Sequence, residues 1–337
     1  MITLGINAAY HDSAAALVRD GEVVAAAEEE RFNHVKHGKR PVPFSAWELP
    51  FHAIDFCLGE AGATLADVDC VAYSYDPARM ADVTDQAMTS RWDPLFVTYL
   101  ENAAAQLRDG APHHLKARIG PGARFAWRFV PHHLAHQASA FLAAPFDECA
   151  VLTMDGRGEA TSTTFGAWRE GRYEALGEVP LPHSLGLLYE EVTDFLGFLR
   201  SSDEYKVMAL ASYGTPRWHE AFREIVRSDG AGGYTVADPR LAERFGPARV
   251  RGAPLTARDC DVARSLQAVL EETALDLARW LHGATGLRDL AMAGGVALNC
   301  VMNARLRDDG PFARVWVQPA AGDAGTALGA ALWVDHE

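Results

Sequence analysis

The chain has 337 residues, of which 49% are hydrophobic and 23% are charged, values typical of a globular protein of roughly two domains. Its formal net charge of -14 opposes broad electrostatic binding to nucleic acid or to an anionic membrane surface. No apolar run reaches the roughly 20 residues of a membrane span, and the five scattered cysteines lack CxxC spacing. We therefore expect a cytoplasmic protein with no nucleic-acid or membrane partner.

Two segments of the chain share one pattern: a buried strand, a polar turn, a second strand, a hairpin dipeptide and a third strand. The first covers residues 2–27, with the hairpin at Asp20-Gly21, and the second covers residues 150–179, with the hairpin at Glu170-Gly171. This repeat predicts two related α/β halves that face each other across a cleft, although two unrelated meanders would give a similar pattern. We place the halves at residues 1–147 and 148–337.

Helical spacing of apolar residues predicts helices over residues 47–60, 94–107 and 266–282, the last of them stopped by Gly283. The stretch 217–254 is polar and rich in glycine and proline. We interpret it as an insertion or a mobile segment that faces the substrate, rather than as a separate domain.

A histidine pair marks a candidate metal site. His132 and His136 are four residues apart in an alanine-rich stretch that favours a helix, so one helical face can present both imidazoles to an ion. Exposed histidines on a helix are the ordinary alternative. Asp155, which follows a hydrophobic strand, and Asp323, in a Gly/Ala-rich turn, could complete a site for iron, zinc or manganese. His133 lies about 100° round the helix and should point away from the ion.

A second candidate site lies where a hydrophobic strand over residues 290–293 meets Gly294 and Gly295. Glycines at such a junction let a ligand approach the backbone, and the next helix would offer its N-terminus to polar groups. Tight packing of the helix on the strand is the alternative.

Seven segments of the chain together carry a family resemblance. They are His11–Ala15, Ala27–Phe32 with Lys36-His37-Gly38, His132–Ser139, Met154–Glu159, Asp203–Leu210, Gly294–Asn303 and Gly322–Gly325. In this order they resemble the NodU/CmcH-type O-carbamoyltransferases of antibiotic and nodulation-factor biosynthesis. The resemblance runs over essentially the whole chain and implies the duplicated actin/hexokinase-like (ASKHA) fold, which tRNA threonylcarbamoyltransferases and the hydrogenase-maturation protein HypF share.

The resemblance implies transfer of a carbamoyl group from carbamoyl-adenylate to a hydroxyl group of a small-molecule natural product. The ion in similar proteins is iron(II), here expected on His132, His136, Asp155 and Asp323. Carbamoyl-adenylate is made from ATP and carbamoyl phosphate by a YrdC-like domain, which we expect either in a missing part of the chain or in a partner protein. The acceptor could be a sugar, a macrolactam, a cephem or a nucleoside.

The same resemblance implies roles for the other candidate residues. His11 matches the catalytic histidine and is our expected general base, and Asp12 could orient it or merely form the turn. The expected nucleotide contacts, of which the two lysines could equally be solvated surface charges, are Lys36, Lys206, Gly294, Gly295, Asn299 and Asn303.

Two other functions remain open at this point. One is a tRNA threonylcarbamoyltransferase-like enzyme with the same fold and metal site, against which the acidic composition and the segments over residues 28–32 and 203–206 argue. The other is a non-catalytic, regulatory nucleotide-binding module.

Overall fold

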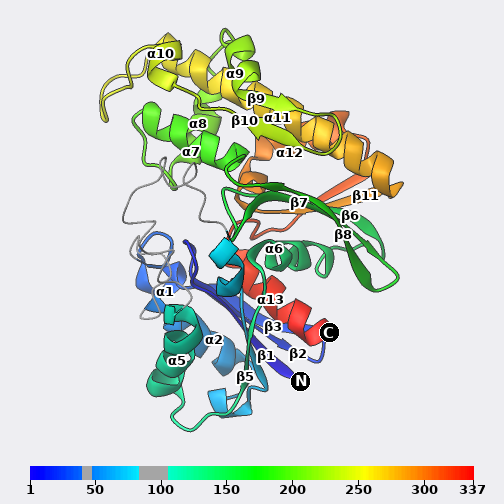
Figure 1. Ribbon diagram of the computed structural model, residues 1–337. Coiled ribbons are helices and arrows are strands. Elements are labelled where there is room, and N and C mark those ends of the chain that lie inside the picture. The colour runs from blue at the N-terminus through cyan, green and yellow to red at the C-terminus, as the bar shows by residue number, and fades with distance from the viewer. Residues whose placement is uncertain (40–47, 83–104) are drawn as a thin grey trace.

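The computed structural model describes residues 1–39, 48–82 and 105–337 (Figure 1). The helix expected over 94–107 therefore lies mainly outside the described residues. The helix expected over 47–60 is present, but it begins only at Phe51, after Pro50. The strands are β1 (Ile2–Asn7), β2 (Ala14–Arg19), β3 (Glu22–Glu28), β4 (Cys70–Tyr73), β5 (Ala126–Phe129), β6 (Cys149–Met154), β7 (Thr161–Arg169), β8 (Arg172–Pro180), β9 (Val226–Ser228), β10 (Tyr234–Val236), β11 (Asp289–Ala293) and β12 (Arg314–Val317).

The helices stand singly or in runs between groups of these strands. They are α1 (Glu30–Asn33), α2 (Phe51–Glu60), α5 (Ala111–Ile119), α6 (His132–Phe141), α7 (Leu185–Phe195), α8 (Glu204–Ala211), α9 (His219–Ile225), α10 (Leu241–Phe245), α11 (Ala257–Thr285), α12 (Cys300–Asp309) and α13 (Ala324–His336), with short turns η2 (Leu65–Asp67), η3 (Pro77–Asp82), η4 (Gln106–Gly110) and η5 (Gly295–Leu298). No helix in the described ranges is both long and apolar enough to cross a membrane.

The duplication expected from the sequence is confirmed by the sheet topology. One five-stranded sheet has the order β3-β2-β1-β4-β5, and the other has the matching order β8-β7-β6-β11-β12. In each sheet the first strand of the repeat pairs antiparallel with the second strand, β1 with β2 and β6 with β7. On its other side it pairs parallel with a later strand, β1 with β4 and β6 with β11. Two equivalent mixed sheets with helices on their faces form an α/β fold of the actin/hexokinase-like class.

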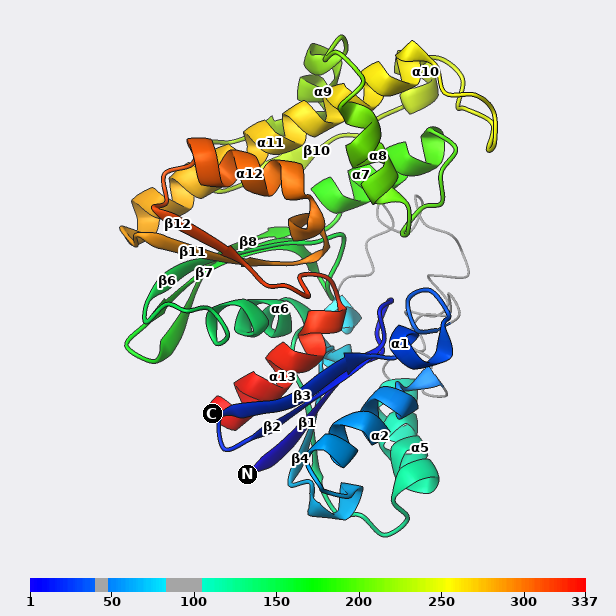
Figure 2. The same ribbon diagram turned by 180° about the vertical axis from the view of Figure 1, so that it is seen from behind.

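Two helices lie between the sheets (Figures 1 and 2). Helix α13, the last element of the chain, packs on β1, β2 and β4 of the first sheet, while α6 packs on β6 and β11 of the second sheet. The two helices also pack closely on each other. The boundary that we placed at residue 147 stays a prediction, because each of these helices lies between the two halves.

Glycine makes this close packing possible. A Cβ atom on Gly329 of α13 would lie 1.8 Å from the backbone oxygen of Ala135 in α6. Likewise, a Cβ atom on Gly5 of β1 would lie 1.9 Å from the backbone oxygen of Ala327. Backbone atoms cannot give way as a flexible side chain can, so a larger residue at either position would separate the elements.

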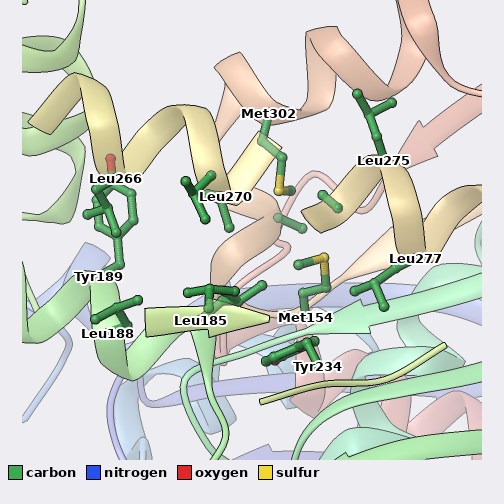
Figure 3. Close-up of a cluster of buried hydrophobic side chains, with 14 of the residues drawn as sticks. Met154, Leu185, Leu188, Tyr189, Tyr234, Leu266, Leu270, Leu275, Leu277 and Met302 are labelled. Atoms are coloured by element: carbon green, nitrogen blue, oxygen red, sulfur yellow. The ribbon is translucent and has the colours of Figure 1, made fainter. Parts of the chain in front are cut away.

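The largest hydrophobic core belongs to the second half and surrounds α11 (Figure 3). The polar stretch 217–254 contributes Phe222, Tyr234 and Phe245 to this core, and α9 packs on α11. The stretch is therefore a folded part of the second half rather than a segment that only faces the substrate.

Helix α11 is longer at both ends than the 266–282 expected. It begins after Thr256, which forms a capping box with Asp259, and it ends at Gly286, whose φ of 64° is left-handed. Gly283, the expected stop, lies inside the helix with no atom within 4 Å of a Cβ atom at that position. Burial of one helical face outweighs the low helix propensity of this single glycine.

The two helical glycines give a matched test of this packing. Gly329→Ala should lower the free energy of unfolding by about 1–3 kcal/mol, because the added methyl group meets the backbone of α6. Gly283→Ala should leave it equal or raise it by up to about 1 kcal/mol, because alanine favours the helix and finds open space. Urea unfolding of both variants measures the difference. Equal stabilities would contradict the tight contact between α6 and α13.

Candidate metal centre and the acid–base pair beside it

Four ionisable side chains converge where the two halves meet. His132 and His136 come from the first turns of α6, Asp155 follows β6, and Asp323 directly precedes α13. One ligand atom from each lies within 4.8 Å of every other, and all four residues are buried. Residues almost 200 positions apart in the chain are thus brought into one cluster by the helix pair.

The distances in this cluster suit a cation. The Nε2 atom of His132 lies 3.4 Å from Asp155 Oδ2 and 3.5 Å from Asp323 Oδ1. For His136 the corresponding distances are 3.7 Å and 3.5 Å. Ligands held at about 2.0–2.2 Å from a tetrahedral ion are about 3.3–3.6 Å apart. In the described part of the chain, neither buried Nε2 atom has a hydrogen-bond partner, which fits a site for a bound metal ion.

The pKa values show how the cluster balances its charge without a cation. Burial raises the pKa of Asp155, but the close His132 and His136 rings more than offset this and hold the pKa well below its usual range. Burial lowers the pKa of both histidines, yet the carboxylates of Asp155 and Asp323 raise these two pKa values above the ordinary one. Two carboxylates therefore face two imidazolium groups. A divalent ion can take the place of their two extra protons with no change in net charge.

Neighbouring groups hold the candidate ligands in place. His132 Nδ1 lies 3.1 Å from the carbonyl oxygen of Ser74, a contact that directs Nε2 of the neutral ring toward the carboxylates. The Oδ1 atom of Asp155 accepts a hydrogen bond of 2.8 Å from the amide of Gly295, which leaves Oδ2 toward the histidines. Gly295 therefore supports the candidate metal site, because a Cβ atom there would lie 2.9 Å from Asp155 Oδ1.

Glu159 is a buried carboxylate to which we assigned no role from the sequence. Its Oε1 atom accepts 2.8 Å hydrogen bonds from the amides of His132 and Asp76. It thus satisfies the first amide of α6 and ties this helix end to the loop after β4. The residue lies in the motif Met154–Glu159, but only the fold shows that it caps the helix bearing both histidines.

His133 does not point away from the site as expected. Its ring is buried, its Nε2 lies 4.0 Å from Asp155 Oδ2, and its Nδ1 lies 3.1 Å from Thr161 Oγ1. Burial lowers the pKa of His133 to about 3, so the ring is neutral. Because a Cβ atom on Gly158 would lie 2.8 Å from this ring, His133 packs under the loop between β6 and β7.

His11 and Asp12 form a hydrogen-bonded pair beside the metal ligands. His11 Nδ1 lies 2.8 Å from Asp12 Oδ2 and 3.9 Å from Asp323 Oδ2. Burial lowers the pKa of His11, but the charges of Asp323 and Asp12 outweigh it and raise this pKa to about 10. The His11 side chain remains 39% exposed, so a ligand can reach it.

The two candidate phosphate-binding lysines lie together beside Asp203. Lys206 Nζ is 2.8 Å from Asp203 Oδ1, and Lys36 Nζ is 3.9 Å from the same oxygen. Lys36 also donates a 3.0 Å hydrogen bond to the carbonyl oxygen of Ser202. The structure thus brings both lysines to one carboxylate, and each side chain is about half exposed.

Of the expected nucleotide contacts after β11, two have a clear local role. Gly294 has a φ of 98°, and a Cβ atom there would lie 2.2 Å from the backbone oxygen of Met154, so glycine is needed for packing. Asn299 caps α12 by accepting from the amide of Met302, and it exchanges two hydrogen bonds with Gln267.

Asn303 also lies in this region, but it retains an unused polar atom. Its Nδ2 donates to the carbonyl oxygen of Ala297 over 2.7 Å, whereas its buried Oδ1 has no hydrogen-bond partner among the described residues. A buried amide oxygen of this kind can accept a hydrogen bond from a ligand.

The fold and the site together define an α/β protein of the actin/hexokinase-like class with a buried His₂Asp₂ cluster. The chain belongs to the carbamoyltransferase family, since the family model described as "Carbamoyltransferase N-terminus" matches residues 2–332. This membership confirms the resemblance seen in the sequence motifs.

Individual relatives agree with this assignment. The chain is 40% identical to the uncharacterized protein sll1178 of Synechocystis over 99% of its own length and 57% of the relative's. It is 37% identical to the nodulation protein NolNO of Sinorhizobium fredii, over 98% of its own length and 47% of the relative's. The chain therefore spans about half the length of these relatives. Full-length HypF in its phosphate- and nucleotide-bound form shares the fold, with a TM-score of 0.54 and 14% identity over 99% of this chain and 55% of HypF.

We expect one divalent ion per chain at the cluster, and Asp323→Ala should release it because two imidazoles and one carboxylate then remain. Binding should expel about two protons near neutral pH, since the raised pKa values of His132 and His136 keep both protonated without metal. Affinity should therefore rise with pH. Calorimetric titration with Zn²⁺ in buffers of different ionisation enthalpy counts the protons. Stoichiometric metal in a His132→Ala/His136→Ala variant would contradict the ligand assignment.

Glu159→Ala should weaken metal binding by about 10–100-fold, the usual effect of losing a group that supports a metal ligand. The reason is that the amide of His132 would lose its partner and the first turn of α6 would loosen. Glu170→Ala is the control, because this carboxylate lies in the hairpin between β7 and β8, outside the site. Equal Zn²⁺ affinity in both variants would show that the cap does not hold the ligands.

Proposed function

We propose that the chain transfers a carbamoyl group from carbamoyl-adenylate to a hydroxyl group of a small-molecule natural product, with a divalent ion in the His₂Asp₂ cluster. Iron(II) is the candidate ion, the cytoplasm is the proposed location, and a YrdC-like domain or protein is the proposed source of carbamoyl-adenylate. One observation carries this proposal. A buried cluster suited to a cation lies beside a half-exposed His–Asp pair, with 3.9 Å between His11 Nδ1 and Asp323 Oδ2, in a chain of the carbamoyltransferase family.

The reaction demands an acid–base group and a site for developing negative charge. The acceptor hydroxyl attacks the carbamoyl carbon, its proton must leave, AMP departs, and charge builds on the carbonyl oxygen. When bound, a divalent ion supplies Lewis-acid stabilisation of that charge or of the phosphate. The ligands that would hold it are His132, His136, Asp155 and Asp323.

His11 is the proposed general base. Its Nδ1 bonds to Asp12, so Nε2 is the nitrogen that remains for the acceptor hydroxyl. The raised pKa of His11 without metal would keep the ring protonated, and the carboxylate of Asp323 is the main group that raises it. Once the charge of Asp323 is balanced by a cation, this pKa falls toward the range in which imidazole accepts a proton near neutral pH.

The donor would lie over the turns that follow β1, β6 and β11. Their backbone amides and the lysines beside Asp203 can meet a phosphate, while Asn303 Oδ1 can accept a hydrogen bond from the nucleoside. Lys36 and Lys206 could turn from Asp203 to the phosphate of the donor, since both side chains are about half exposed.

The proposal predicts carbamoylated products when the chain receives carbamoyl-adenylate, metal and a panel of hydroxyl acceptors, followed by mass spectrometry. His11→Asn should keep metal and AMP binding yet lower the transfer rate by about 10²–10⁴-fold, mainly in kcat, because the proton moves only in the transition state. His52→Asn, at an exposed histidine bonded to Glu29, is the control. A protein that binds AMP but transfers carbamoyl to no acceptor would be a nucleotide-binding module instead. Near-normal kcat in His11→Asn would remove His11 from the mechanism.

A further inference from the structure

Asp12 holds two histidines rather than one. Its Oδ2 atom lies 2.8 Å from His11 Nδ1, and its Oδ1 atom lies 2.7 Å from Nδ1 of His37. The two imidazole centroids are 5.2 Å apart. Each oxygen of the carboxylate is therefore engaged by a different ring, and the second ring fixes the plane of the carboxylate that the first ring uses.

The far nitrogen of His37 contacts the second half of the chain. His37 Nε2 lies 3.2 Å from Oγ of Ser202, which belongs to the turn between α7 and α8 in the second half. The neighbouring Lys36 donates to the carbonyl oxygen of the same serine over 3.0 Å. A continuous set of contacts thus runs from Ser202 through His37 and Asp12 to His11.

The backbone has an unusual conformation at both Asp12 and His37. Asp12 has a φ of 52° and His37 a φ of 67°, values that lie in the left-handed region and are uncommon for residues other than glycine. The amide of His37 donates to Glu30 Oε2 over 2.8 Å, and its carbonyl oxygen accepts from the amide of Ser13 over 3.1 Å. Such conformations cost free energy and persist where the surrounding contacts impose them, often at functional sites.

We propose that His37 is a positioning residue, which orients Asp12 and through it His11, and that Ser202 links this orientation to the second half of the molecule. With Asp12 fixed, the Nδ1–H of His11 has one partner, and Nε2 is directed to the acceptor. The catalytic consequence rests on the proposed function, whereas the orientation of the ring does not. His37 stands within the motif Lys36-His37-Gly38, from which only the lysine had a predicted role.

The left-handed backbone provides substitutions that spare the fold. His37→Gly removes the ring, and glycine adopts this conformation at no steric cost. His37→Asn tolerates it as well, and its side-chain amide can still donate to Asp12 but cannot also reach Ser202. His52→Phe removes a different imidazole–carboxylate contact from the same half and serves as the control.

The first measurement is the NMR resonance of the His11 Nδ1–H proton in Zn²⁺-loaded protein, assigned by its absence in His11→Asn. We expect it to be lost or to shift upfield in His37→Gly, and to persist in His37→Asn and His52→Phe. An unchanged resonance in His37→Gly would overturn the positioning role. Because this measurement needs neither donor nor acceptor, it decides the proposal even if no carbamoyl transfer occurs.

The second measurement is steady-state transfer with carbamoyl-adenylate and the best acceptor from the panel. His37→Gly should lower kcat by about 10–100-fold and leave KM nearly unchanged, since ring orientation matters in the transition state. His37→Asn should recover most of this loss. Ser202→Ala combined with His37→Gly should be no slower than His37→Gly alone, because both changes break one connection. Independent, additive effects would refute the link through Ser202, and an unchanged kcat in His37→Gly would refute the catalytic consequence.

Discussion

The close parallel packing of α6 on α13 is the constraint on which the site depends. His132 and His136 at the beginning of α6 face Asp323 at the beginning of α13, and the ring of Phe141 near the end of α6 lies 6.4 Å from that of Trp333. Glycine at the helix crossing lets the two axes approach, so the N-termini of both helices meet at one point. The partial positive charges of these helix ends favour the two carboxylates there. A larger distance between α6 and α13 would move the candidate ligands apart even if all four residues were kept.

The buried cluster also explains how a strongly acidic chain can keep a neutral centre. It contains two carboxylates and two imidazoles. Without a metal ion, one extra proton on each imidazole balances the two negative charges, as a divalent cation would. The surrounding groups are of two kinds. Backbone atoms such as the amide of Gly295 and the carbonyl of Ser74 aim the ligands, while Glu159 fixes the helix that carries two of them. The loops after β4, β6 and β11 thus position the four candidate ligands.

The repeat of strands and hairpins could be predicted because it is local: the turn dipeptides and the alternation of apolar residues lie within short stretches of chain. The pairing of His132 with His136 was equally accessible, since four residues make one helical turn. Other features depend on contacts between distant segments. His37 meets Asp12, Glu159 caps α6, and His133 turns toward the loop above it only after the halves have come together. No spacing along the chain encodes those approaches, and the ends of α11 were misjudged because tertiary burial extends it past Gly283.

The return of α13 to the first sheet has a consequence for how the protein is made. This helix is synthesised about three hundred residues after β1 and β2, the strands that it covers. Until about three hundred further residues have been translated, one face of the N-terminal sheet lacks its own cover and stays exposed to water. A domain whose elements are close together in the sequence can fold during synthesis. This sheet instead stays partly uncovered until α13 has been made, unless another protein covers it. Ribosome-bound chains that stop before α13 should therefore be substrates for chaperones that recognise apolar surfaces.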